Sequence, residues 1–307
     1  MRLWYIGGGQ FAASCLEHMS EHLQFEWVVT NRPTRAGRGL RERPSAVEQT
    51  ALALGLPLER TGTLSQNETI QETLASNPPD LIFVVDFGQL IREPFLSTPI
   101  HGCLNIHPSR LPRWRGSAPV QRAILNGDLA TGVTVFRLTE ELDAGPVLTQ
   151  TQTPIPLLMD STELLKILAL EGSQIAVQGV ESIIEGSYQF SEQNSELSTY
   201  AAKLKKTEAE VSWGQDSIHV HNTVRAFASS TGAFVSVRGK RLKLWRTAPV
   251  DAQGEPGRIL SLAEGGLVVA CAEGAIRLAE VQAEGKRRMS GADWACGDRL
   301  RAGEGLT

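Results

Sequence analysis

The chain has 307 residues, of which 41% are hydrophobic and 21% are charged, and its formal net charge is −4. These values are typical of a globular protein with room for two domains, and no apolar run approaches the roughly 18 residues that would predict a membrane span. The four cysteines are too scattered for a zinc site or a disulfide framework. We therefore expect a cytoplasmic protein with no metal site.

Segments rich in β-forming residues alternate with helical patterns through the first half of the chain. Strands are predicted at residues 3–6, 25–30 and 81–87, and helices at residues 11–22 and 45–54, the second with Ser45 as its N-cap. This alternation predicts a Rossmann-like, doubly wound α/β fold with a mostly parallel sheet.

Three glycines, Gly7–Gly9, follow the first predicted strand. Together with Ala12 they resemble a dinucleotide-binding fingerprint, but the second strand ends at Thr30 and Asn31 without the acidic residue that would hold a ribose. This argues against NAD and leaves an NADP-dependent oxidoreductase as an alternative. The simpler interpretation is that the glycines permit a tight strand-to-helix turn.

An arginine-rich segment occupies residues 31–44. It has little to bury, which predicts a mobile loop whose arginines contact phosphate groups and become ordered on binding. A solvated run of charge is the alternative. The arginines are Arg32, Arg35, Arg38, Arg41 and Arg43.

The stretch Gly102–Gly116, reading GCLNIHPSRLPRWRG, begins as an apolar run and changes at Pro108. Because proline cannot donate to a sheet ladder, we expect a strand that finishes near His107. Asn105 and His107 are two residues apart, so their side chains share one face of that strand. The carboxyl end of a strand in an open parallel sheet is where ligands bind.

After this stretch, a helix is predicted at residues 118–126 and a strand at 132–138, followed by a turn at 142–146. The turn places Asp143 past the carboxyl end of a strand, and we expect it at the same edge as His107. An aspartate in a Gly-Pro turn is usually a turn former. Its predicted closeness to Asn105 and His107 gives it a second role.

The remainder divides into a long helix at residues 162–185 and a region of short alternating runs from about residue 211. We predict a catalytic domain at 1–188, a linker at 189–205 and a small C-terminal β-barrel at 206–307. Residues 203–307 hold 16 Lys and Arg against 12 Asp and Glu, a net charge of +4, whereas residues 1–202 carry −8. A basic C-terminal unit favours a polyanionic partner.

An Asn, His and Asp set at a sheet edge suits acyl transfer without an enzyme nucleophile. Asparagine donates to an oxyanion, histidine donates or passes a proton near neutral pH, and aspartate orients the imidazole. Neither Ser109 nor Cys103 is clearly paired with a base. Direct transfer between two bound substrates, through a tetrahedral intermediate and without a covalent enzyme intermediate, is therefore the simpler hypothesis.

The residues from Asn105 to Leu148 also resemble the core of the folate-dependent formyltransferases. The likeness rests on Asn-x-His, then Ser-x-Leu-Pro and Arg-Gly, and on Leu-Asp-x-Gly after Glu141. The Ala36–Gly39 loop, residues 84–88 and residues 286–290 extend it over nearly the whole chain.

The resemblance implies transfer of the formyl group of 10-formyltetrahydrofolate to the α-amino group of methionine on initiator tRNA, for translation initiation. It implies a C-terminal OB-like barrel that binds the tRNA, a monomeric cytoplasmic protein, and no membrane or metal. The implied catalytic residues are Asn105, His107 and Asp143. The implied folate-binding residues are Ser109, Arg110, Leu111, Pro112, Phe87, Gly88, Gln89 and Leu90. The implied tRNA-binding residues are Arg35, Arg38, Arg41, Arg43, Lys203, Lys205 and Lys206.

Three positions depart from the family pattern. Arg110 stands where leucine is usual, Asp86 replaces a common alanine, and residues 228–231 replace an Asn-Pro-Trp-Pro turn. A related enzyme that formylates an amino sugar-nucleotide would share the catalytic trio, and it remains an alternative substrate class.

Overall fold

The computed structural model describes residues 1–36, 41–263 and 265–306. The chain forms two compact units. The first contains residues 1–116, 130–153 and 165–201, and the second contains residues 117–129, 154–164 and 202–307. Within the described residues, no helix is long and apolar enough to cross a membrane.

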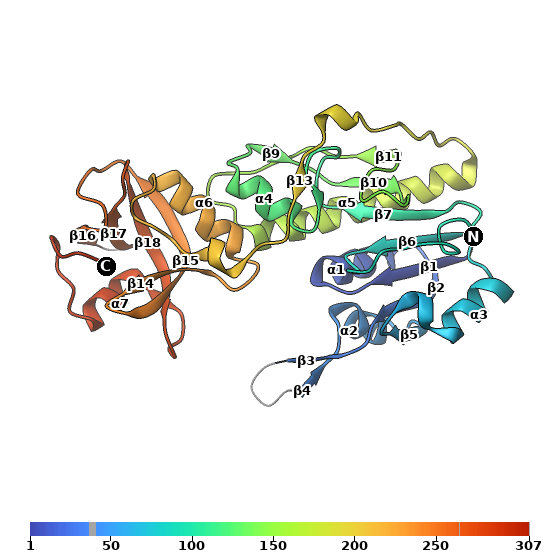
Figure 1. Cartoon of the computed structure of the whole chain (residues 1–307), viewed down its shortest axis with the longest axis horizontal. Coiled ribbons are helices and arrows are strands. Elements are labelled where there is room, and N and C mark those ends of the chain that lie inside the picture. Colours follow the sequence, from blue (N-terminus) through green and yellow to red (C-terminus); the bar gives the residue numbers. More distant parts are fainter. Residues whose placement is uncertain (37–40, 264, 307) are drawn as a thin grey trace. The chain divides into compact units, whose positions relative to one another are not determined.

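The first unit is built on a seven-stranded sheet with the order β11-β10-β7-β6-β1-β2-β5 (Figure 1). The five strands from β7 to β5 run parallel, and β10 and β11 are antiparallel additions at one edge. The strands are β1 (Leu3–Gly7), β2 (Phe25–Asn31), β5 (Leu58–Thr61), β6 (Leu81–Val85), β7 (Cys103–His107), β10 (Thr134–Arg137) and β11 (Val147–Gln150). The predicted mostly parallel α/β sheet is confirmed.

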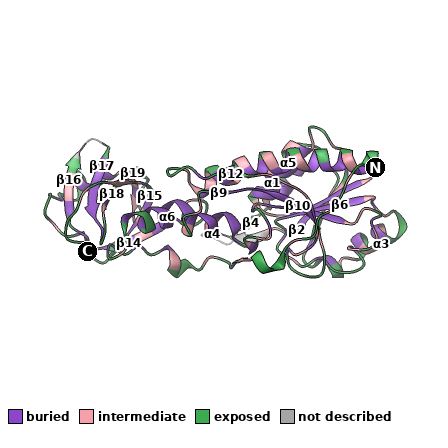
Figure 2. Ribbon diagram, turned by 90° about the horizontal axis from the view of Figure 1, so that it is seen from above, coloured by how far each residue is buried: buried purple, intermediate pink, exposed green. Residues whose placement is uncertain are grey.

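Helices cover both faces of this sheet. On one face α1 meets α5, where the Cys15 thiol lies 3.8 Å from the Ala169 carbonyl oxygen and Ser173 donates to the carbonyl of Cys15. The helices are α1 (Gln10–Met19), α2 (Ala46–Ala53), α3 (Glu68–Ser76) and α5 (Ser161–Glu185). The central strands of the sheet are coloured as buried in Figure 2.

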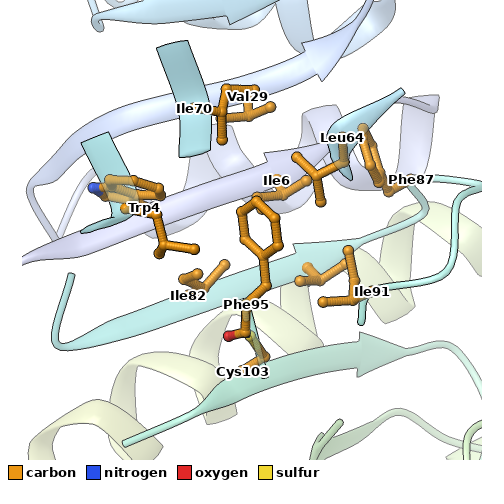
Figure 3. Close-up of a cluster of buried hydrophobic side chains, with 12 residues drawn as sticks. Trp4, Ile6, Val29, Leu64, Ile70, Ile82, Phe87, Ile91, Phe95 and Cys103 are labelled. Atoms are coloured by element: carbon orange, nitrogen blue, oxygen red, sulfur yellow. The ribbon is translucent and has the colours of Figure 1, made fainter. Parts of the chain in front are cut away.

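The opposite face carries a cluster of buried apolar side chains, drawn in Figure 3. Ile6, Ile82 and Cys103 contribute from three neighbouring strands, and Ile70 of α3 and Phe95 cover them. β-branched and aromatic residues fill the pleated surface of buried parallel strands, which explains the near-continuous apolar runs in the sequence. This packing fixes the strands whose ends form the candidate site.

The arginine-rich segment differs from the predicted irregular loop. Its described ends, β3 (Thr34–Ala36) and β4 (Arg41–Arg43), pair as antiparallel strands. Backbone pairing of this kind needs no buried side chain, so a polar sequence can form it. Arg38 lies outside the described residues.

The second unit contains an antiparallel sheet with the order β14-β15-β18-β17-β16, and β19 pairs with β18. Its strands are β14 (Ala233–Val237), β15 (Lys240–Val250), β16 (Ile259–Ala263), β17 (Gly266–Ala270), β18 (Ala275–Ala283) and β19 (Met289–Ser290). Its helices are α4 (Pro119–Leu125), α6 (Ser217–Phe227) and α7 (Gly291–Gly297). This antiparallel C-terminal domain agrees with the predicted fold class.

Candidate active site

β7 ends at His107, as Pro108 predicts. The register pairs Asn105 with Val84 on β6, and it pairs Asn105 and His107 with Phe136 and Thr134 on β10. Paired residues share a face, so Asn105 and His107 project from the face that carries the apolar cluster. The Asn105 side-chain amide makes no hydrogen bond to any other residue that the structure describes, and it is partly open to solvent.

His107 is buried, with 6% of its surface exposed, and its imidazole lies between two groups. Its Nε2 is 2.9 Å from the carbonyl oxygen of Trp114, and its Nδ1 is 3.8 Å from Oδ2 of Asp143. A carbonyl can only accept, so Nε2 carries the proton in the neutral imidazole. Nδ1 is then unprotonated on the side that faces the Asp143 carboxylate. This arrangement suits a base that forms an ion pair on protonation.

Asp143 is buried too, and its carboxylate is held by a main-chain group. Its Oδ2 accepts a hydrogen bond of 2.7 Å from the amide of Gly116. Its φ of +50° lies in the left-handed region, which aspartate tolerates better than most residues. Two residues later, a Cβ on Gly145 would stand 1.9 Å from the Arg137 carbonyl oxygen, so only glycine fits this turn.

The route by which Asp143 reaches His107 differs from the prediction. β10 runs antiparallel to β7, so its carboxyl end at Arg137 pairs with Leu104, at the amino half of β7. The loop between β10 and β11 turns back and delivers Asp143 to the opposite end of β7. The expected closeness of Asp143 and His107 is thus present, but the expected reason for it, two parallel strand ends, was wrong.

Residues 109–112 form a turn directly beside this pair. Ser109 is fully buried, and its hydroxyl donates to the Arg113 carbonyl at 2.7 Å. The amide of Leu111 donates to Thr134 Oγ1 at 3.1 Å, which ties the turn to β10. Arg110 is exposed and donates to Gln152. Pro112 is half-buried.

Residues 87–90 follow β6 at the same end of the sheet. Phe87 packs into the apolar cluster, Gly88 has a φ of +77°, and Leu90 is exposed. Gln89 donates to Asn31 Oδ1 at 2.9 Å, and Asn31 donates to the Phe87 carbonyl at 2.9 Å. These bonds join the ends of β2 and β6, a connection for which the sequence offered no signal.

Asp86 lies at the start of this segment, against the glycine turn after β1. Its carboxylate occupies the space that a Cβ on Gly9 would need, since Oδ2 would be 1.7 Å away. The group is accessible to solvent yet surrounded by protein atoms, and this desolvation raises the pKa of Asp86 to about 6. A carboxyl group with a raised pKa therefore stands at the carboxyl ends of the neighbouring strands β6 and β1.

The remaining predicted residues belong to the arginine-rich segment and to the second unit. Arg43 is exposed on β4, and the side chains of Arg35 and Arg41 are not described. Lys203, Lys205 and Lys206 are exposed in the second unit. His219 and His221 are no metal site: His221 is buried and both its nitrogens are bonded, to Thr247 and to the carbonyl of Leu157. No group of three metal-ligating side chains occurs among the described residues.

A basic and aromatic surface in the second unit was not predicted residue by residue. A hollow of about 720 Å³ is lined by Phe234, Arg241 and Lys243 among others, and the Arg241 guanidinium lies 3.9 Å from the centre of the Phe234 ring. Nearby, Arg288 lies 3.5 Å from the centre of the Trp245 ring. The basic residues along β15, which follow Phe234 on β14 and flank Trp245, are the sequence signal that could have identified this surface.

Both halves of the chain match models of one family. Residues 1–180 match the formyl transferase model, and residues 203–299 match the model of the formyl transferase C-terminal domain. The chain therefore belongs to the formyl transferase family.

Within that family, two relatives that match over nearly their full length are methionyl-tRNA formyltransferases. The chain is 38% identical to that of Aromatoleum aromaticum over 305 residues, which are 99% of this chain and 96% of the relative. It is 36% identical to that of Magnetococcus marinus over 99% of this chain and 98% of the relative. Among solved structures, an N-formyltransferase from Helicobacter canadensis, in complex with folinic acid and dTDP-3-aminofucose, covers 91% of this chain and 98% of its own with a TM-score of 0.67. Its 17% identity limits that likeness to the fold.

Proposed function

We propose that the protein transfers the formyl group of 10-formyltetrahydrofolate to the α-amino group of initiator methionyl-tRNA, giving N-formylmethionyl-tRNA and tetrahydrofolate. The observation that carries the proposal is the buried His107–Asp143 pair beside the Asn105 amide, which no described residue bonds. It stands in a chain that resembles methionyl-tRNA formyltransferases over 99% of its length. Because the product serves translation initiation, we place the reaction in the cytoplasm.

The first step is attack of the amine nitrogen on the formyl carbon, which makes a tetrahedral intermediate with a negative oxygen. Asn105 supplies a side-chain donor that no described residue accepts from. The Nε2 proton of His107 is already donated to the Trp114 carbonyl, so that bond fixes the ring and leaves Nδ1 as the group that takes part in the reaction. Donors fixed in place before the reaction stabilise the developing charge without reorganisation. A protein nucleophile is not required.

The second step moves one proton. The attacking nitrogen gives its proton to Nδ1 of His107, and the imidazolium is stabilised by Asp143, whose Oδ2 is 3.8 Å away. The bond between the formyl carbon and N10 then breaks, its electron pair goes to N10, and the imidazolium returns the proton to that nitrogen. Histidine and aspartate end as they began.

The folate is held, in this proposal, by the two segments that flank the pair. Residues 109–112 and 87–90 both lie at the carboxyl ends of neighbouring strands, and the exposed Leu90 offers apolar surface to a pterin ring, whereas Leu111 is buried against Phe136 and anchors the first segment. Arg110, where the family usually has leucine, adds a cation on the exposed side of the first segment. An Arg110→Leu variant that binds 10-formyltetrahydrofolate no differently in a fluorescence titration would remove Arg110 from the folate site.

The tRNA contacts would come from the arginine segment and from the second unit. Arginines meet phosphates and base edges well, so Arg35, Arg38, Arg41 and Arg43 suit the acceptor stem. Lys203, Lys205 and Lys206 add exposed charge in the second unit. Arg38→Ala should raise KM for the tRNA and leave folate binding unchanged. An unchanged KM would return the segment to a solvated run of charge.

A formylation assay tests the function directly. Wild-type protein is supplied with 10-formyltetrahydrofolate and either methionyl-tRNA or a dTDP-linked amino sugar, and formylated products are separated and counted. We expect transfer to methionyl-tRNA alone. Transfer only to the amino sugar would assign the protein to the sugar-nucleotide substrate class, and stoichiometric NADPH binding without transfer would favour an oxidoreductase.

A further inference from the structure

Residues 191–201, which we call the strap, follow α5 and run along both loops of the candidate site. At the start of the strap Ser191 exchanges two backbone hydrogen bonds with Val147, at 2.8 and 2.9 Å. At its end, β13 (Tyr200–Ala201) pairs in parallel with β8 (Arg115–Gly116). These residues fall in the segment that the sequence predicts to be a linker. They lie wholly within the first unit.

The centre of the strap contacts the turn that carries Asp143. The Gln193 side-chain amide donates to two main-chain carbonyls, that of Asp143 at 2.9 Å and that of Gly145 at 2.8 Å. Its side-chain oxygen accepts from Arg115, through Nε at 3.1 Å and Nη2 at 2.9 Å. One side chain thus joins the loop of Asp143 to the loop that follows His107.

The orientation of this amide is fixed by its partners. An arginine can only donate and a carbonyl can only accept, so the oxygen of Gln193 must face Arg115 and its NH₂ group must face the turn. Arg115 is 1% exposed, and its third contact is Glu141 at 3.4 Å, in the loop that carries Asp143. Because an unpaired buried guanidinium is costly, Arg115 strongly favours the conformation in which Gln193 bonds it. The Gln193 side chain is therefore held in one orientation.

The strap also holds the group on the other side of the imidazole. Thr199 Oγ1 accepts from the Trp114 amide at 2.9 Å, and the Trp114 carbonyl faces Nε2 of His107. The His107 ring has two neighbours, the Asp143 carboxylate and the Trp114 carbonyl. Each belongs to a residue whose main chain is bonded to a strap side chain, Asp143 to Gln193 and Trp114 to Thr199.

We propose that Gln193 is a positioning residue for formyl transfer: braced by Arg115, it sets the turn at Asp143 so that the carboxylate faces His107 and accepts from Gly116. This inference rests on the proposed function, because it assumes that Asp143 acts through His107. Gln193 itself touches no reacting atom.

Gln193→Glu tests the proposal with almost no change in shape. The new carboxylate keeps two acceptors for Arg115, but it places an oxygen instead of a donor against the carbonyls of Asp143 and Gly145. Asn194→Asp is the matched control. It adds the same charge one residue later, on an exposed side chain, and it keeps the acceptor that bonds the Glu196 amide.

The first readout needs no substrate. The Gly116 amide donates to Asp143 Oδ2, so its proton shift and hydrogen-exchange rate report the position of that carboxylate. We expect Gly116 to lose protection in Gln193→Glu and to keep it in Asn194→Asp, with similar melting temperatures. An unchanged Gly116 amide in Gln193→Glu would overturn the proposal, whether or not the wild type formylates tRNA.

The second readout is the steady-state kinetics of transfer. Because a misplacement of about 1 Å can lower a rate on the order of 10²-fold, we expect kcat to fall about 10- to 100-fold in Gln193→Glu with KM for both substrates little changed. In an Asp143→Asn background the same substitution should cause no further loss. A full additional loss there would show that Gln193 acts by another route.

A second variant covers the case in which Gln193→Glu does not fold. Gln193→Asn keeps the amide and shortens it by one methylene, so it cannot reach Arg115 and both carbonyls together. We expect a smaller fall in kcat and partial loss of Gly116 protection. Wild-type kcat and protection in this variant would contradict the proposal.

Discussion

The candidate site depends at the residue scale on one imidazole with a different partner on each nitrogen. Nε2 of His107 faces the Trp114 carbonyl, and Nδ1 faces Asp143. His107→Ala removes the base, so we expect transfer to fall on the order of 10²- to 10⁴-fold. Single-turnover formylation measures this fall.

Binding separates this loss from a folding defect. His107 is buried in the first unit, whereas the basic surface defined above belongs to the second, so tRNA affinity in a filter-binding assay should stay close to wild type. His107→Asn, which keeps a donor for the Trp114 carbonyl but has no base, should stay close to the rate of His107→Ala. Strong residual transfer in His107→Ala would remove His107 from the chemistry.

Asp86 leads to a prediction about pH. Burial raises its pKa to about 6, so the folded state holds this proton more tightly than the unfolded chain does. The stabilising effect is present below pH 4, where the carboxyl is protonated in both states, and is lost as the pH rises through 6. Relative to Asp86→Asn, the wild type should therefore lose unfolding free energy between pH 4 and pH 6.

Urea denaturation of both proteins at a series of pH values measures this difference. Above pH 7 the difference should be constant, because the carboxyl is ionised in both states. An equal difference at pH 4 and pH 7 would mean that Asp86 titrates normally. Gly9 gives a linked test. Gly9→Ala should lower the free energy of unfolding more in the wild-type background than in an Asp86→Ala background, where the space for the new Cβ is open.

At the scale of elements, α2 begins where the sequence predicts. Ser45 Oγ accepts from the Glu48 amide at 2.9 Å and lies 2.7 Å from Thr30 Oγ1, which in turn donates to the Gly7 carbonyl. The cap thus joins the helix to β2 and β1. Ser45→Ala should lower the free energy of unfolding by about 1 kcal/mol, measured by urea denaturation.

Ser45→Asp provides the control, because it keeps an oxygen acceptor for Glu48. It should recover most of the loss. If both variants unfold at the wild-type urea concentration, the cap contributes nothing to global stability and α2 opens separately.

The direction of β10 is the element-level feature that the sequence could not supply. A strand, a helix and a second strand in series predict a parallel βαβ unit. Here α4, the helix between β7 and β10, packs against α6 within the second unit. β10 then joins β7 as an antiparallel neighbour, and the three elements form no parallel βαβ unit. Which helix packs against which surface is decided by partners far away in the sequence.

At the scale of the whole molecule, the two units carry charge of opposite sign, and the basic one contains the hollow beside β14 and β15. Arg241 lines that hollow over the Phe234 ring. Cations with a neighbouring aromatic ring suit a nucleic acid backbone and its bases. Arg241→Ala should weaken tRNA binding and reduce the slope of log K against log salt by about one.

Arg258→Ala is a charge-matched control in the same unit, because its guanidinium is already paired with Glu255 at 2.7 Å. It should leave the salt slope unchanged. Equal slopes for wild type and Arg241→Ala, measured by fluorescence titration from low to physiological salt, would exclude Arg241 from the tRNA contact.

The sequence by itself determined the fold class, the end of β7 and the shared face of Asn105 and His107. These follow from local rules, namely the period of a strand, the missing amide of Pro108 and the alternation of strands and helices. The tertiary structure decided the direction of β10, the position of Asp143 beside His107 and the hydrogen bonds of Gln193 to that turn. A polar side chain in a loop leaves no periodic signal, and its partner is chosen only when distant segments pack together.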